Sequence, residues 1–109
     1  MTRVTFRRSK RGGYRGYVAE GHAESAPRGE YDLVCGAVSV LAVTGANALE
    51  RVAGIEPVAS QGDGQVCCFL PPELDEAAWE RAQIILRTVE TGIEDIAKQY
   101  PEYVRIEVQ

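Results

Sequence analysis

The chain has 109 residues, of which 45% are hydrophobic and 26% are charged. This size and composition are typical of one soluble domain spanning residues 1–109, whose core needs neither disulfides nor a structural metal. The net charge of −4 hides an asymmetry, because residues 1–15 carry six basic side chains and no acidic one.

A hairpin and a long loop are predicted first. Alternating polar and apolar residues predict strands at Thr2–Arg7 and Tyr14–His22, joined by the turn-forming segment Ser9–Gly13. Ala23–Tyr31 has no periodicity and predicts a loop that is functional or mobile. The basic hairpin could contact RNA, but no RNA-binding motif accompanies its charges. We therefore favour a solvated hairpin without direct nucleic-acid binding.

A very apolar helix should follow this loop. Asp32 is a good N-cap, and the helix runs from Leu33 to about Leu49 without a single charge. Its length is near the lower limit of a membrane span, but small and polar residues such as Gly36 and Asn47 dilute its hydrophobicity. We expect a helix buried in a soluble core rather than a membrane segment.

A second hairpin and a second helix are predicted next, without any internal sequence repeat. Short strands are predicted at Glu56–Ser60 and Gln65–Leu70, with a glycine-rich turn between them. Asp75 caps a second helix, whose apolar residues recur every three or four positions until Pro101 stops it. A last strand is predicted at Tyr103–Val108.

The order β-β-α-β-β-α-β predicts a single-domain two-layer α/β sandwich, in which two helices pack on a mixed sheet of about five strands. Trp79 and Leu86 are expected in the core, together with at least one of Cys67 and Cys68, which are adjacent in a strand.

The three cysteines, Cys35, Cys67 and Cys68, are odd in number, and neighbouring cysteines rarely bridge each other. No secretory signal is present, because no apolar run follows the basic N-terminus. We therefore expect the protein to reside in the reducing cytoplasm. There is no C-x-x-C pair and no His–Cys cluster with metal-ligand spacing, so neither a metal nor another cofactor is expected.

Candidate catalytic residues stand on either side of the first loop. Cys35 lies in the first turn of the helix, where the partial positive charge of the N-terminus favours a thiolate, and His22 could exchange a proton with it. Asp32 either caps the helix, which we favour, or orients His22 as the third member of a triad.

Other interpretations remain open on spacing alone. A cysteine in an apolar helix is usually a small buried hydrophobe, and a histidine near a turn is usually only polar. Rival functions are a non-enzymatic ribosome- or RNA-binding module that uses the basic hairpin, and another thiol activity such as acyl transfer or redox sensing. Cys67 and Cys68, in strand material, are expected to be structural.

Gly-His-Ala, a glycine-containing loop and Asp-Leu-Val-Cys-Gly-Ala-Val-Ser resemble the signature of the ribosomal-processing cysteine proteases, a bacterial family often called Prp. The resemblance extends through the Val-Cys-Cys-Phe-Leu strand to the final Tyr-Pro-Glu-Tyr-Val segment. One departure is Gly36, where the family more usually has alanine. Glycine there weakens the first helical turn slightly but lets a substrate backbone approach closely.

This resemblance implies that His22 and Cys35 are a catalytic dyad, with Asp32 as a candidate supporting residue. It also implies a homodimer and a mobile loop over the active site at Ala23–Tyr31. The implied substrate is the large-subunit ribosomal protein numbered twenty-seven, from which a cysteine endopeptidase of this family removes a short N-terminal extension during ribosome assembly.

Overall fold

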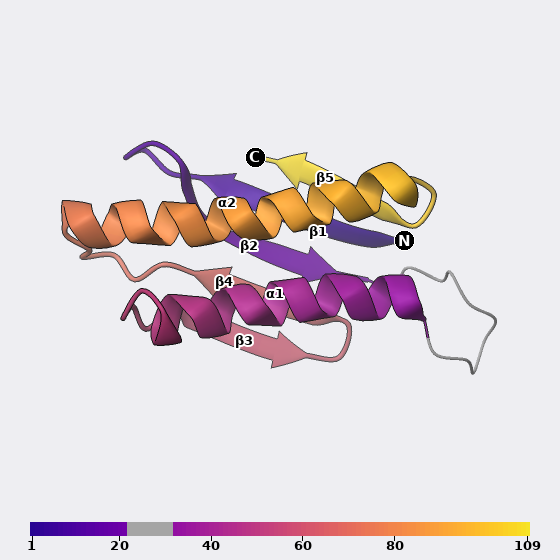
Figure 1. Cartoon of the computed structure of the whole chain (residues 1–109), viewed down its shortest axis with the longest axis horizontal. Coiled ribbons are helices and arrows are strands. Elements are labelled where there is room, and N and C mark those ends of the chain that lie inside the picture. Colours follow the sequence, from indigo (N-terminus) through magenta and orange to yellow (C-terminus); the bar gives the residue numbers. More distant parts are fainter. Residues whose placement is uncertain (22–31) are drawn as a thin grey trace.

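The computed structural model describes residues 1–21 and 32–109, and Figure 1 shows how its elements are arranged. The element order is the one that the sequence predicts. The strands are β1 (Thr2–Arg8), β2 (Tyr14–Glu20), β3 (Val58–Gly62), β4 (Gln65–Phe69) and β5 (Val104–Val108), and the helices are α1 (Leu33–Arg51) and α2 (Glu76–Gln99).

Some predicted boundaries differ from those in the structure. Strand β2 ends at Glu20 rather than at His22, which lies outside the described residues, as does the predicted loop Ala23–Tyr31. Strand β3 begins at Val58, directly after Pro57. A proline has no N–H to donate to a neighbouring strand, which explains why pairing starts after Pro57, two residues later than predicted.

The five strands form one mixed sheet in the order β3-β4-β2-β1-β5. Only the β1–β5 pair is parallel, and the other three pairs are antiparallel. Figure 1 shows both helices side by side over the same face of this sheet. The predicted two-layer α/β sandwich is therefore confirmed.

The core lies between the helices and the sheet face that they cover. Val4 and Phe6 alternate along β1 on this face and have no exposed surface. Leu86 of α2 is fully buried against them, as predicted. Cys68 is also fully buried, whereas the adjacent Cys67 is only partly covered, so one cysteine of the pair points inward as expected.

The prediction that Trp79 is a core residue is wrong. Its side chain is only partly buried, and the guanidinium of Arg11 lies 4.3 Å from the centre of its ring. Arg11 also donates to the carbonyl of Leu74 at 2.8 Å. The tryptophan thus holds the basic hairpin to the start of α2 by a cation–π contact.

Helix α1 is buried along one stripe rather than on most faces, which corrects the expectation from its composition. Only five of its nineteen residues are buried. Leu33 is 73% exposed and Val40 is 65% exposed. By length and composition alone α1 could cross a membrane, but the core helix of a soluble protein passes the same test, so this is weak evidence.

One buried hydrogen bond fixes α1 on the sheet. The hydroxyl of Tyr17, in β2, donates to the carbonyl oxygen of Ala42 at 2.6 Å, and Tyr17 has no exposed surface. Burial raises the pKa of this phenol far above its usual range. Gly45 lies on the same face of α1, where the absence of a side chain makes room for the tyrosine ring.

We predict that Gly45→Ala destabilises the protein. The new methyl group would overlap the Tyr17 hydroxyl and lie 2.7 Å from Cγ2 of Val89. Overpacking of this kind costs about 1–3 kcal/mol, more than alanine gains in helix propensity. Urea denaturation measures the change in the free energy of unfolding.

Gly92→Ala is the matched control, because its methyl group would meet only the end of the flexible Leu41 side chain, at 2.8 Å. This variant should be neutral or slightly stabilising. Equal stability of the two variants would contradict the close packing of Tyr17 against Gly45.

Candidate active site

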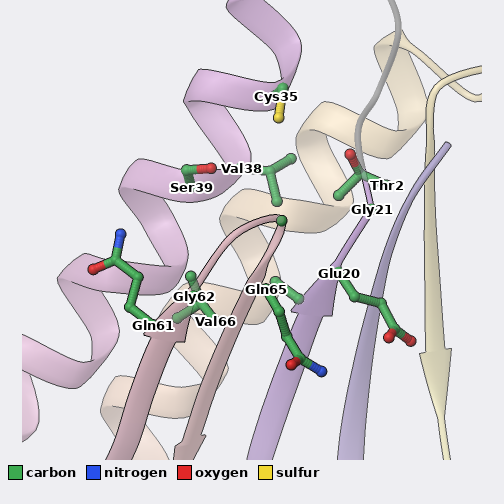
Figure 2. A pocket seen from close by; sticks show the side chains of 12 residues that line it. Thr2, Glu20, Gly21, Cys35, Val38, Ser39, Gln61, Gly62, Gln65 and Val66 are labelled. Atoms are coloured by element: carbon green, nitrogen blue, oxygen red, sulfur yellow. The ribbon is translucent and has the colours of Figure 1, made fainter.

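A cleft of about 200 Å³ opens at the end of the sheet where β1 begins and β2 ends. The first turns of α1 form one wall, and the turn between β3 and β4 forms another (Figure 2). The cleft is lined by Thr2, Ala19, Glu20, Gly21, Cys35, Val38, Ser39, Gln61, Gly62, Gly64, Gln65 and Val66. Polar side chains and glycine backbone therefore make up much of the lining.

Cys35 reaches this cleft from the first turn of α1. Its side chain is partly exposed, and Figure 2 shows the sulfur pointing from the helix into the cleft. Cys35 is therefore not one of the fully buried core residues, although it packs against the margin of the core. A thiol at a helix N-terminus lies where the macrodipole stabilises a negative charge.

Asp32 is the N-cap of α1, as predicted. Its carboxylate oxygen Oδ1 accepts a hydrogen bond from the backbone N–H of Cys35 at 3.1 Å, and its carbonyl accepts from the N–H of Gly36 at 2.9 Å. The cap thus holds the backbone of the cysteine itself. The carboxylate has a structural task here, while its proposed second role in orienting His22 stays a prediction.

The end of β2 is shaped by Gly21. This residue has a φ of 88°, and a Cβ at this position would overlap the carbonyl oxygen of Met1, so only glycine fits. Its N–H donates to the carbonyl of Gly64 at 2.9 Å, which ties the exit of β2 to the β3–β4 turn. The backbone is thus fixed up to the residue that precedes His22.

Among the predicted site residues, Cys35 and Asp32 are described and lie together. His22 is outside the described residues, but Gly21, to which it is bonded, lines the same cleft as Cys35. Within residues 1–21 and 32–109, no group of three or more histidine, cysteine or acidic side chains could hold a metal ion.

Cys67 and Cys68 lie in strand β4, away from Cys35. Cys68 is fully buried beside Tyr17, and burial raises the pKa of its thiol to about 11. It therefore stays a neutral thiol at physiological pH. Neither residue lines the cleft that holds Cys35.

Two residues that line the cleft were not predicted as site residues, although their positions in the sequence indicate where they lie. Ser39 is four positions after Cys35, a spacing that places both on one face of a helix. Thr2 shares the sheet face of the buried Val4 and Phe6, so it is a polar residue at a core-facing position. Gln61 and Gln65 left no comparable signal, because their place depends on how β3 and β4 pair.

The chain matches, over residues 1–105, the family described as cysteine protease Prp. It is 33% identical over 108 residues to the ribosomal processing cysteine protease Prp of Bacillus subtilis (strain 168). That alignment covers 97% of this chain and 96% of the relative.

Solved structures share the fold. The crystal structure of the ribosomal processing protease Prp from S. aureus, in complex with a covalently linked product peptide, superposes with a TM-score of 0.85 over all of both chains at 22% identity. The structure of SMU.848 from Streptococcus mutans gives a TM-score of 0.77 at 31% identity, covering all of this chain and 94% of that one.

We predict that Asp32→Ala lowers the free energy of unfolding by about 1 kcal/mol, because the Cys35 N–H loses its partner. Asp32→Ser should restore most of this, since serine is an equally good cap. Asp75→Ala is the matched control at α2, where the carboxylate accepts from Ala78 N–H at 2.8 Å. Urea denaturation of the three variants measures the effect; a loss in Asp75→Ala without one in Asp32→Ala would contradict the capping role.

Proposed function

We propose that this chain, which belongs to the Prp family of cysteine proteases, is an endopeptidase that removes the N-terminal extension of a ribosomal protein. The observation that carries this proposal is the position of Cys35, partly exposed in a cleft at a capped helix N-terminus. We further propose that Cys35 and His22 are the catalytic dyad.

The proposed reaction proceeds through a covalent intermediate. His22 accepts the thiol proton while Sγ of Cys35 attacks the peptide carbonyl carbon, and the same proton then passes to the leaving amine as the C–N bond breaks. Water hydrolyses the resulting thioester and releases the acid. Backbone N–H groups at the start of α1 stabilise the developing oxyanion. The N–H of Cys35 itself is already bonded to Asp32, which favours other amides of this turn for that task.

The substrate class follows from the relatives. The B. subtilis relative is named for ribosomal processing, and two of the S. aureus structures carry a covalently linked product peptide and a substrate peptide. We propose the large-subunit ribosomal protein numbered twenty-seven, in its N-terminally extended form, as the substrate. We also propose action in the cytoplasm, in keeping with three free thiols.

The basic hairpin does not compete with this proposal for the same surface. Strand β1 runs from Thr2 at the cleft to Arg8 at the hairpin, so the two surfaces lie at opposite ends of the strand (Figure 1). Membership of a protease family disfavours the rival non-enzymatic module. We propose that the protein does not bind nucleic acid directly. Cleavage of the free protein substrate in the absence of RNA would support this part of the proposal.

We propose that the protein is a homodimer whose partner covers the outer surface of the helix layer. Leu33 and Val40 of α1 and Ile84 of α2 are 73%, 65% and 68% exposed. Between the helices runs an apolar groove that includes Leu41 and Ile85. Exposed apolar side chains beside an apolar groove are the feature that favours an interface between subunits at this surface.

We predict that Cys35→Ala abolishes cleavage of the extended ribosomal protein, while its circular dichroism spectrum and urea midpoint stay close to those of wild type. Mass spectrometry of the substrate after incubation detects the shortened product. Cys67→Ala is the control and should leave cleavage intact, because Cys67 does not line the cleft. Residual cleavage by Cys35→Ala would refute the nucleophile assignment, and failure of this variant to fold would favour a core role for Cys35 instead.

We predict that Val40→Glu shifts the protein from dimer to monomer, because a buried unpaired carboxylate is costly at an interface. Light scattering coupled to size-exclusion chromatography measures the mass. Val58→Glu is the control, since Val58 on β3 is equally exposed at 65% but lies outside the helix layer. A wild-type protein that is monomeric at all concentrations would contradict the dimer.

A further inference from the structure

Thr2 occupies an unusual position in the cleft. It begins β1 and shares the face of Val4 and Phe6, which are completely buried under the helices. The residue itself is only 3% exposed, yet it is one of the residues that line the cleft with Cys35. In Figure 2 it stands on the strand side of the cleft, across from the helix that carries Cys35.

The hydroxyl of Thr2 has no hydrogen-bond partner. Its oxygen Oγ1 is buried, and it is the single buried side-chain nitrogen or oxygen without a partner in the part of the chain that the structure describes. The backbone N–H of the same residue is satisfied, since it donates to the carbonyl of Tyr103 at 2.8 Å. The missing hydrogen bond therefore concerns only the side-chain hydroxyl.

An unpaired buried hydroxyl destabilises a protein, because the group has lost its bonds to water and gained none in return. Valine has nearly the same shape and would fill this position without that cost. Such unsatisfied groups are few in native proteins and call for an explanation. A partner that arrives from outside explains both the missing bond and the place of Thr2 in the cleft.

We propose that the Thr2 hydroxyl is a substrate-binding group, which hydrogen bonds to the main chain of the peptide held in the Cys35 cleft. This inference rests on the proposed peptidase function. A hydroxyl both donates and accepts, so it suits either a peptide N–H or a peptide carbonyl. A rotation of about 120° about χ1 carries Oγ1 to the position that Cγ2 or Hβ now holds, so Oγ1 can turn toward the peptide without movement of β1.

The chain offers a matched set of variants. Thr2→Val removes the hydroxyl and keeps the shape, whereas Thr2→Ser keeps the hydroxyl. Thr5→Val is the same change at the other buried threonine of β1, which is 5% exposed, alternates to the opposite face of the sheet and does not line the cleft. The substrate is a synthetic peptide that spans the extension junction of the ribosomal protein.

Thr2→Val should raise the urea midpoint and lower kcat/KM by about tenfold, which corresponds to the loss of one hydrogen bond. Thr2→Ser should retain nearly wild-type kcat/KM, and so should Thr5→Val. A gain in stability together with a loss of activity distinguishes a binding role from a structural one. Unchanged kcat/KM in Thr2→Val would overturn the inference, and so would a loss that Thr2→Ser shares.

A second measurement separates this inference from the proposed function. Binding of the fluorescently labelled peptide to Cys35→Ala, with and without Thr2→Val, is followed by anisotropy. If wild type does not cleave the peptide, the peptidase proposal fails for this substrate. Weaker binding caused by Thr2→Val would still support the contact, whereas equal binding by the two proteins would reject it.

Discussion

The hydrogen bond between the buried Tyr17 hydroxyl and the Ala42 carbonyl is the constraint from which the site geometry follows. It joins the middle strand of the sheet to the middle of α1. Ala42 is seven residues after Cys35, a distance of about two helical turns or ~10 Å. Because a helix is rigid over this length, fixing Ala42 also fixes where the first turn of α1 meets the end of the sheet. Any change that shifts α1 at Tyr17 should therefore displace Cys35 from the cleft.

Local chemistry accounts for what the sequence predicts correctly. Both N-caps, Asp32 and Asp75, stand directly before a periodic apolar segment, and each carboxylate accepts the expected backbone hydrogen bond. Alternation along a strand required at least one of Cys67 and Cys68 to point inward, and Cys68 does so. These features depend only on residues a few positions apart. Such interactions are readable from one chain without knowledge of the tertiary structure.

Features that depend on tertiary pairing were not predictable in this way. Trp79 looks like a core residue by type. In the structure its ring lies at the margin of the core, under the guanidinium of Arg11, a hairpin residue 68 positions earlier in the sequence. Thr2 and Gln61 enter the cleft only because the start of β1 and the end of β3 lie at the same end of the sheet. The exposure of apolar residues on α1 was equally hidden, because composition does not tell which faces of a helix pack against the rest of the domain.

The position of Thr2 beside the cleft determines where the N-terminus of a recombinant protein lies. The carbonyl of Met1 packs against Gly21, so anything fused to the N-terminus would leave the molecule beside the cleft. The C-terminus lies at the opposite end of β1 from the cleft, because the carbonyl of Gln109 accepts a hydrogen bond from the N–H of Arg8 beside the hairpin (Figure 1). An affinity tag on the C-terminus would therefore extend from the hairpin end of the sheet, whereas an N-terminal tag would extend from beside the cleft.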